Sequence, residues 1–433
     1  SYSTDQYYRE HEAVAKEAAR LYGLNEERLQ RQREDLIHHW KANRPDWDEA
    51  AFDACYDLES IRKAAEGRKP NVLVVGYAFC SGGGETFAIQ VANQMKAEGH
   101  NVTFLDCGQE PELPGIRALL ARDIPVVTAL QALEAIIEAF QIDIVHSHHA
   151  WVDNSILDLL PEGGRARHVL TLHGMYETIA DRDLDRIVPR AAKRVSSFAY
   201  ISEKNLHPFV SRVPGVRDRF HRVDNALAPV PFEARSRAEL GIPEGAFVLT
   251  TVSRAIPEKG WREAVAAVAR ARETSGRDIH LVLVGDGPVY EALKREGAPD
   301  FVHPVGFQPD SRAFYAMGDM GLLPSRFAGE SFPLVLIECL QAGRPMIATA
   351  LGEIPRMLDV GEGRLAGATL PLRDGGVDVE ALAALIARFA SDPSALAEAL
   401  ARVADAARKF DPKIMREAYS EIYDLSLRHR LAS

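Results

Sequence analysis

The sequence predicts an α/β protein with two Rossmann-like domains in tandem, preceded by a helical extension. Short apolar runs alternate with amphipathic segments of helix length from about residue 70 onward, which is typical of parallel βα units. A proline-containing segment, 226–237, interrupts this alternation, which then starts afresh, as expected of a linker between two domains. Residues 1–68 are charged and have only helical periodicity.

These patterns divide the chain into four parts: an extension over 1–68, a first domain over 69–228, a second domain over 229–410 and a C-terminal helix over 411–433. The extension carries no recognisable chemistry. We expect it to pack on the body of the protein, on a second copy or on a partner, and the sequence does not distinguish these. The C-terminal helix is expected to return toward the first domain.

The first domain is expected to open with a strand, a glycine-rich loop, a helix and a second strand, at 71–76, 77–84, 85–98 and 101–106. Gly83 and Gly84 put flexible backbone and free amides at a helix N-terminus, where phosphate groups bind. The dinucleotide fingerprint G-x-G-x-x-G is not matched, because it requires glycine where the chain has Ala78 or Phe87.

Polar side chains follow the later strands of the first domain. These strands are expected at 143–147, 168–174, 197–202 and 219–223. His148, His149 and Trp151 follow the first of them, and His173 ends the second. Ligands bind at the carboxyl ends of strands in open parallel sheets, so the pattern favours a ligand site there.

The second domain repeats the βα pattern. Strands are expected at 247–253, 279–284, 317–325 and 345–349, and the stretches 301–303 and 305–307 are expected to lead to a helix near 311–317. The last helices are expected at 377–391, 393–409 and 412–429. The loop RAIPEKGW after the first strand carries Arg254 and Lys259, two cations that suit a diphosphate. A solvated surface loop is the alternative.

The segment GESFPLVLIECLQAGRP, 329–345, reads as a loop and a helix that follow a buried strand. Pro333 suits the first helical position, since it has no N–H to leave unpaired. The amides of Leu334 and Val335 would then be free in the first turn, where anions bind.

Two glutamates of this segment, Glu330 and Glu338, are separated by a rise of about 12 Å in helical geometry. That separation suits a sugar at one end and a ribose at the other end of a diphosphate. The alternative is a pair of solvated glutamates on an ordinary helix. An unpaired charge among the apolar neighbours of Glu338 would be costly, which favours a ligand.

Composition narrows the class of protein. Hydrophobic residues make up 46% and charged residues 26%, as in ordinary globular proteins, and the formal charge of −11 argues against nucleic-acid binding. We find no apolar run long enough to span a bilayer and no signal-peptide core. Four scattered cysteines without a C-x-x-C pair predict neither a zinc cluster nor a disulfide framework, and we expect a cytoplasmic protein.

Six motifs together resemble family 4 of the retaining glycosyltransferases: SGGGE (81–85), TLHG (171–174), SRAIPEKGW (253–261), LVGDGP (283–288), VGF (305–307) and ESFPLVLIECLQAGRP (330–345). The resemblance covers about residues 70–430. It implies the GT-B fold, with two Rossmann-like domains facing across a cleft. It also implies a UDP- or GDP-sugar donor held mainly by the second domain, a hydroxyl acceptor held mainly by the first, and transfer with retention.

Matching the motifs residue by residue gives each position an implied role. Glu330 would orient the transferred sugar and His173 would contact it, as the catalytic pair. The implied donor-binding residues are Arg254, Lys259, Glu338, Gly83, Gly84, Ser331, Phe332, Pro333, Leu334 and Val335. Lys259 is expected to be exposed. The implied acceptor residues are His148, His149 and Trp151, with core packing as an equal alternative for Trp151.

The sequence departs from the family pattern at Ser331 and Pro333, where glycines are common, and at Glu353 and Arg356. These departures leave the donor sugar open. No cofactor beyond the nucleotide-sugar co-substrate and no metal is expected, because the two cations and the helix end would neutralise the diphosphate.

The acceptor is expected to be a saccharide, a lipid-linked molecule or a small molecule. Peripheral contact with the inner membrane face is a further alternative, because many members of the family use lipid-linked acceptors. Two other classes stay open: a sugar-nucleotide epimerase or phosphorylase of the same build, and a non-catalytic nucleotide-sugar-binding module.

Overall fold

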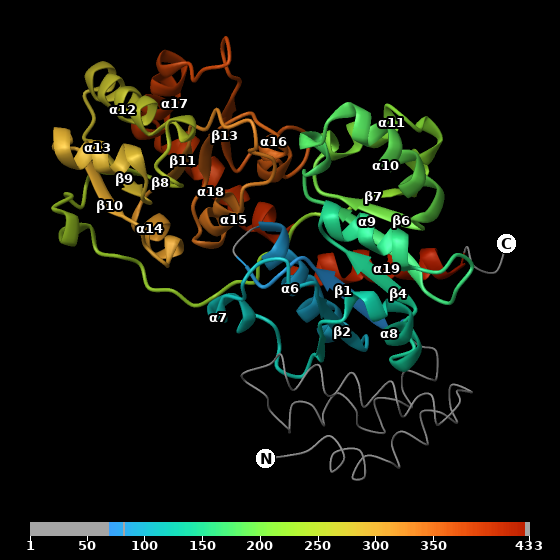
Figure 1. Cartoon of the computed structure of the whole chain (residues 1–433). Coiled ribbons are helices and arrows are strands. Elements are labelled where there is room, and N and C mark those ends of the chain that lie inside the picture. The colour runs from blue at the N-terminus through green and yellow to red at the C-terminus, as the bar shows by residue number, and fades with distance from the viewer. Residues whose placement is uncertain (1–68, 81–82, 429–433) are drawn as a thin grey trace, which may run out of the picture. The chain divides into compact units, whose positions relative to one another are not determined.

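The structure is a computed structural model that describes residues 69–80 and 83–428. The predicted extension, 1–68, lies outside the described residues. The chain divides into two compact units: the second runs from Asp224 to Ile414, and the first contains the other described residues, up to Val223 and from Met415 onward. Each unit is a parallel α/β domain, so the predicted fold class is confirmed (Figure 1).

The described part of the first unit contains a seven-stranded sheet in the order β3-β2-β1-β4-β5-β6-β7, with parallel pairing throughout. Its strands are β1 (Val72–Gly76), β2 (Val102–Asp106), β3 (Val126–Val127), β4 (Ile144–Ser147), β5 (Arg167–Leu172), β6 (Ser197–Tyr200) and β7 (Phe220–Arg222). Its helices include α6 (Gly83–Ala97), α7 (Pro114–Arg117), α8 (Leu133–Ala139), α9 (Ala150–Leu159), α10 (Asp181–Arg194) and α11 (His207–Val210).

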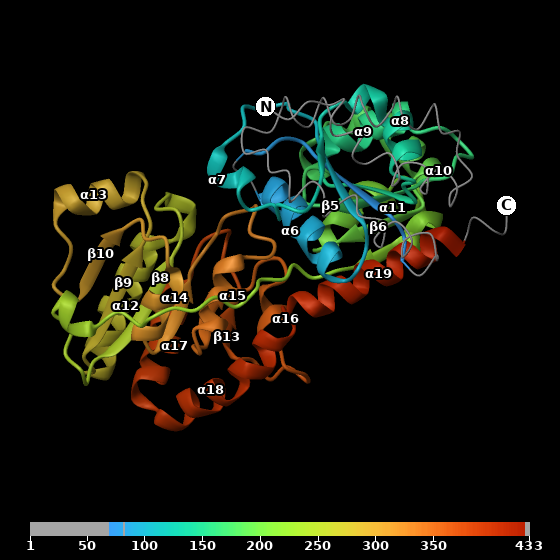
Figure 2. The same ribbon diagram turned by 90° about the horizontal axis from the view of Figure 1, so that it is seen from below.

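The C-terminal helix α19 (Pro412–Arg428) lies along the first sheet (Figure 2). Polar side chains join the helix to the sheet. The hydroxyl of Tyr423 lies 2.7 Å from Nδ1 of His146, and the hydroxyl of Tyr419 lies 3.0 Å from Oγ1 of Thr171. His146 and Thr171 are themselves bonded at 2.7 Å. All four side chains are buried, so these hydrogen bonds fix the helix against the centre of the sheet.

The second unit contains a six-stranded parallel sheet in the order β10-β9-β8-β11-β12-β13. Its strands are β8 (Phe247–Val252), β9 (Ile279–Val284), β10 (Val302–Gly306), β11 (Met320–Leu323), β12 (Met346–Thr349) and β13 (Gly367–Leu370). Its helices are α12 (Trp261–Ser275), α13 (Pro288–Glu296), α14 (Ser311–Met317), α15 (Leu334–Gln341), α16 (Ile354–Leu358), α17 (Val379–Ser391) and α18 (Pro393–Arg408).

Both sheets reverse their strand order once, between β1 and β4 in the first unit and between β8 and β11 in the second. Loops leave the two strands at such a point in opposite directions, and ligands of open α/β sheets bind in the crevice that opens there. The loops after these four strands are therefore where a site is expected. No helix in the described part of the chain is both long and apolar enough to cross a membrane.

Candidate active site

The loops after β8 and β11 are in direct contact in the second unit. Gly260 has a φ of +75°, and a Cβ there would lie 1.9 Å from the carbonyl oxygen of Pro324. The amide of Arg326 donates to the carbonyl of Glu258 at 2.8 Å. Only glycine tolerates both this conformation and this approach, so Gly260 allows the two loops to meet.

Lys259 and Glu330 form a buried ion pair where these loops meet. Lys259 Nζ lies 2.6 Å from Glu330 Oε2, and the two residues are only 9% and 8% exposed. The expectation that Lys259 is exposed is therefore wrong. Its ammonium is held by a carboxylate from the neighbouring loop and lies 4.9 Å from the centroid of the Phe327 ring. A charge buried this deeply requires such a partner.

Arg254 and Lys259 both contact the ring of Phe327. The Arg254 side chain is exposed, and its guanidinium carbon lies 5.6 Å from the ring centroid. Both cations that were predicted to bind the diphosphate therefore make cation–π contacts with one aromatic ring, at the carboxyl edge of the sheet. Sequence reasoning missed Phe327, although an aromatic residue three positions before Glu330 in a loop was a usable signal.

The backbone of the Arg254 loop is fixed by the GDGP turn. A Cβ at Gly285 would lie 1.8 Å from the carbonyl oxygen of Ser253, and the backbone there has a φ of +142°. The amide of Ala255 donates to the carbonyl of Asp286 at 2.7 Å. These contacts position the backbone from which Arg254 extends.

Helix α15 begins at Leu334, with Pro333 at the N-cap, one residue later than predicted. Phe332 is buried and packs edge-on against Phe410, which fixes the chain as it enters the helix. Leu334 is exposed. The amides of Leu334 and Val335 have no carbonyl one turn earlier in the helix, so the first turn offers donors and the positive end of the helix dipole.

Glu338 faces helix α14 and accepts a hydrogen bond of 2.5 Å from the hydroxyl of Ser311. Its side chain is half-buried. A carboxylate accepts up to about four hydrogen bonds, so Glu338 keeps acceptor capacity for a ligand after this contact. Ser311 is a second residue that sequence reasoning missed.

The residues that depart from the family pattern support the Glu330 loop. The carbonyl of Ser331 accepts from the amide of Glu353 at 2.8 Å. The guanidinium of Arg356 donates to Glu353 at 2.7 Å and to both carboxylate oxygens of Asp224 at 2.7 and 2.9 Å. Glu353 and Arg356 therefore tie the loop to the segment that enters the second unit.

In the first unit, α6 begins at Gly83, and its first turn lies against two histidines. A Cβ at Gly84 would lie 3.7 Å from the carbonyl oxygen of His148 and 4.0 Å from the ring of His173. His148 Nδ1 lies 3.3 Å from His173 Nε2. These predicted residues, far apart in sequence, are thus brought together at the strand-order reversal of the first sheet.

His149 and Trp151 follow strand β4 at the same edge of the sheet. The ring of His149 caps α9 by accepting from the amide of Trp151 at 3.1 Å, and it stacks on Tyr77 with the ring centroids 4.1 Å apart. Trp151 is 41% exposed, which rules out core packing for it. Tyr77, His149 and Trp151 form an aromatic surface that was only partly predicted.

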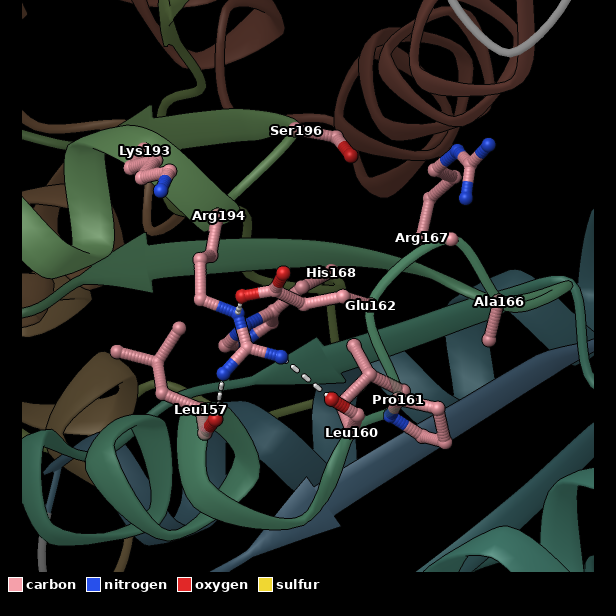
Figure 3. Close-up of a pocket in the computed structure, with 11 residues that line it drawn as sticks. Leu157, Leu160, Pro161, Glu162, Ala166, Arg167, His168, Lys193, Arg194 and Ser196 are labelled. Carbon is pink, nitrogen blue, oxygen red and sulfur yellow. Dashed lines mark hydrogen bonds and ion pairs between the residues drawn. The ribbon is translucent and has the colours of Figure 1, made fainter.

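The opposite, amino-terminal edge of the first sheet has a cavity of about 240 Å³ (Figure 3). Its central cation, Arg194, donates to the carbonyls of Leu157 and Leu160, as Figure 3 shows, and pairs with Glu162 at 3.5 Å. These carbonyls end helix α9, so Arg194 acts as its cap. We assign this cavity a structural role.

Four histidines of the first unit, three of them buried and His173 half-buried, predict a marked loss of stability in acid. Burial lowers the pKa values of His146 and His148 well below 6.5, and those of His168 and His173 to about 3. The unfolded chain therefore binds more protons below pH 6.5, so stability is lost as the pH falls from 6.5 toward 3. Burial raises the pKa of Asp153 to about 7, so the folded protein keeps a proton on this carboxyl that the unfolded chain releases. This release offsets the proton uptake of one histidine on unfolding.

We expect the free energy of unfolding of the first unit to fall by at least about 1.4 kcal/mol per pH unit between pH 6 and 5. Hydrogen exchange, corrected for its intrinsic pH dependence, measures each unit separately. The second unit is the internal control and should change less. Equal slopes in the two units would contradict the neutral histidines.

Solved structures share this fold. The HepE protein of Anabaena in complex with UDP aligns with a TM-score of 0.65 at 19% identity, covering 81% of this chain and 98% of that one. Sucrose-phosphate synthase of Thermosynechococcus elongatus aligns with a TM-score of 0.60 at 18% identity, covering 84% and 100%. The fold is therefore that of the GT-B glycosyltransferases.

Family models and characterised relatives agree with the fold. Residues 81–249 match the model described as Glycosyltransferase Family 4, and residues 246–405 match Glycosyl transferases group 1. N-acetyl-alpha-D-glucosaminyl L-malate synthase of Bacillus anthracis is 26% identical over 306 residues, 65% of this chain and 79% of that protein. 2-Deoxystreptamine N-acetyl-D-glucosaminyltransferase of Streptomyces fradiae is 29% identical over 273 residues, 55% and 63%.

The chain belongs to the family 4 type of GT-B glycosyltransferases, and its function is glycosyl transfer.

Proposed function

We propose that the protein is a retaining hexosyltransferase that moves a sugar from a UDP- or GDP-sugar to an acceptor hydroxyl. The observation that carries this proposal is the buried Lys259–Glu330 pair, with Arg254 beside it, at the strand-order reversal of the second sheet. Cleavage of the bond to the diphosphate puts negative charge on the leaving phosphate. Fixed cations stabilise that charge most when they need no reorganisation.

In this proposal, each chemical group of the nucleotide sugar has a binding partner in the second unit. Arg254, Lys259 and the first-turn amides of α15 bind the diphosphate. Glu330 accepts hydrogen bonds from the sugar hydroxyls while its other oxygen holds Lys259. Glu338, oriented by Ser311, accepts from the ribose hydroxyls. These groups perform the charge neutralisation, so we expect turnover to continue in EDTA.

The first unit supplies the acceptor side of the proposal. His173 is predicted to contact the transferred sugar, and His149 and Trp151 offer an aromatic surface of the kind that stacks on sugar rings. The acceptor hydroxyl attacks on the face that the diphosphate leaves, and the leaving phosphate takes its proton. Orientation of the two substrates contributes the rest of the rate enhancement.

Relatives guide the choice of substrates. HepE of Anabaena was solved with UDP and with UDP-glucose, which favours UDP as the nucleotide. The names of relatives specify L-malate, 2-deoxystreptamine and D-inositol 3-phosphate as acceptors. All are small polar molecules with hydroxyl groups, so we propose an acceptor of this kind. We also propose a cytoplasmic location, consistent with the free thiols of Cys80, Cys107 and Cys339.

The test begins with a thermal-shift screen of the full-length protein against UDP, GDP and their sugars. The best donor is then incubated with the three acceptors named above, with and without EDTA, and the product anomer is determined by NMR. We expect the anomeric configuration of the donor to be kept, and an inverted product contradicts retention. Epimerised donor without acceptor favours an epimerase, and binding without turnover favours a non-catalytic module.

A further inference from the structure

His148 and His173 form a direct histidine–histidine contact in the first unit. Nδ1 of His148 lies 3.3 Å from Nε2 of His173, and the ring centroids are 5.5 Å apart with an interplanar angle of 35°. The two residues end adjacent strands, β4 and β5. Two ring nitrogens at this distance share one proton when both rings are neutral, because one nitrogen must donate and the other accept.

Both rings are neutral near pH 7. Burial lowers the pKa of His148 well below 6.5 and that of His173 to about 3. Nearby rings act in the same direction, since a charge on either histidine would repel a charge on its neighbour. The pair therefore has two arrangements, which differ only in the direction of the hydrogen bond.

The surroundings of His148 favour one direction. Its residue is 2% exposed, and its Nε2 is buried without a hydrogen-bond partner among the described residues. If His148 accepted at Nδ1, its proton would lie on Nε2 as a buried, unpaired donor, which is rare in folded proteins. If His148 donates from Nδ1, its Nε2 is unprotonated and carries only a lone pair. This second arrangement therefore leaves no buried N–H without an acceptor.

The ring of His148 is held in place from two sides. It packs against the ring of His146 at a centroid distance of 4.1 Å and against the edge of Phe87 at 5.8 Å. His146 is fixed in turn, because each of its nitrogens lies 2.7 Å from a hydroxyl, of Tyr423 and of Thr171. His148 therefore points its Nδ1 at His173 from a rigid base that includes helix α19.

We propose that His148 is a positioning residue, whose Nδ1–H donates to Nε2 of His173 and thereby holds the proton of His173 on Nδ1. This inference rests on the proposed function, because it concerns the state in which His173 meets the transferred sugar. His173 then presents an N–H donor at Nδ1, suited to an oxygen of the sugar, with its ring orientation set by His148.

The first test reads the tautomer without substrate. Long-range ¹H–¹⁵N spectra of the ¹⁵N-labelled full-length protein distinguish a protonated from a bare ring nitrogen, and loss of signals in His173→Gln assigns His173. We expect His173 to carry its proton on Nδ1. A proton on Nε2 of His173 overturns the proposal.

Two variants of His148 separate positioning from packing. The amide of His148→Asn lies where Nδ1 was and can still donate, whereas that of His148→Gln lies where Nε2 was. We expect the Nδ1–H form of His173 in the Asn variant and its loss in the Gln variant. Identical spectra from the two variants contradict the proposal. If the Gln variant fails to fold, the wild-type and Asn spectra decide.

Turnover provides the second test. His148→Gln is expected to lower kcat by about 10- to 100-fold with little change in the KM for the donor, and His148→Asn to lose clearly less of kcat than His148→Gln. Equal losses in both variants contradict positioning through Nδ1. If His173→Gln leaves turnover unchanged, the sugar contact of the proposed function fails, while the tautomer result stands independently.

Discussion

Replacing Lys259 by Ala is expected to weaken the binding of UDP or GDP about 100-fold and to lower the free energy of unfolding of the second unit by about 3 kcal/mol. The affinity falls because a fixed cation for the diphosphate is lost. Stability falls because Glu330, 8% exposed, would keep its charge in a buried position with no ammonium beside it. Calorimetric titration with each nucleotide and urea unfolding measure the two effects.

Arg254 is the matched control for Lys259. It contacts the same ring of Phe327 but is exposed, so Arg254→Ala should weaken nucleotide binding while leaving unfolding almost unchanged. The double variant Lys259→Met, Glu330→Gln removes both buried charges and should recover stability without recovering affinity. Unchanged affinity in Lys259→Ala would remove Lys259 from the site. Unchanged stability in that variant would contradict the buried pair.

The error about Lys259 shows where local sequence reasoning stops. A lysine in a proline- and glycine-containing loop resembles a solvated cation, and its burial depends on Glu330, 71 positions away. The sequence did predict that both residues belong to one sheet edge, because each follows an apolar strand. It could not predict that Gly260 lets the loops touch and so removes both charges from water.

Strands were predictable in proportion to their length and apolar character. The four residues of β11 and the six of β9 are all buried, and apart from His280 they carry no polar side chain, as expected of strands covered on both faces. The two-residue strand β3 and the glycine-containing strand β13 were missed, because each is held by its neighbour in the sheet rather than by its own pattern. Propensity over two to four residues is too weak to identify such strands.

The histidines of the first unit were predicted as a group but not as a network. His148 and His173 were recognised because each ends a strand, and parallel strands bring such residues to one edge. The role of His146 was hidden, since it points into the sheet face covered by α19 and its partner Tyr423 is 277 positions away. The sequence predicts which residues lie at the edge of the sheet, whereas tertiary packing determines which of their side chains are in contact.

Replacing Gly260 by Ala is expected to destabilise the second unit and to separate the two loops that carry Lys259 and Glu330. The backbone has a φ of +75°, which costs about 1 kcal/mol for a non-glycine residue, and the new Cβ would lie 1.9 Å from the carbonyl oxygen of Pro324. That oxygen belongs to the backbone and cannot rotate away, so the two loops must separate. We expect a loss of about 2–4 kcal/mol in the free energy of unfolding.

Gly276 offers a matched control on the same helix. Gly260 and Gly276 cap the two ends of α12, and both have left-handed backbones, with φ of +75° and +66°. A Cβ at Gly276 meets nothing within 4 Å, so Gly276→Ala measures the conformational cost alone, about 1 kcal/mol. The additional loss in Gly260→Ala then measures the clash between the loops.

The nucleotide affinity of the same two variants tests the site itself. Separation of the loops in Gly260→Ala should pull Lys259 from Glu330 and weaken UDP binding, whereas Gly276→Ala should bind UDP as the wild type does. Equal losses of stability in the two variants would contradict the close approach of Gly260 to Pro324. A stability loss in Gly260→Ala without a loss of affinity would mean that nucleotide binding does not depend on the contact between these loops.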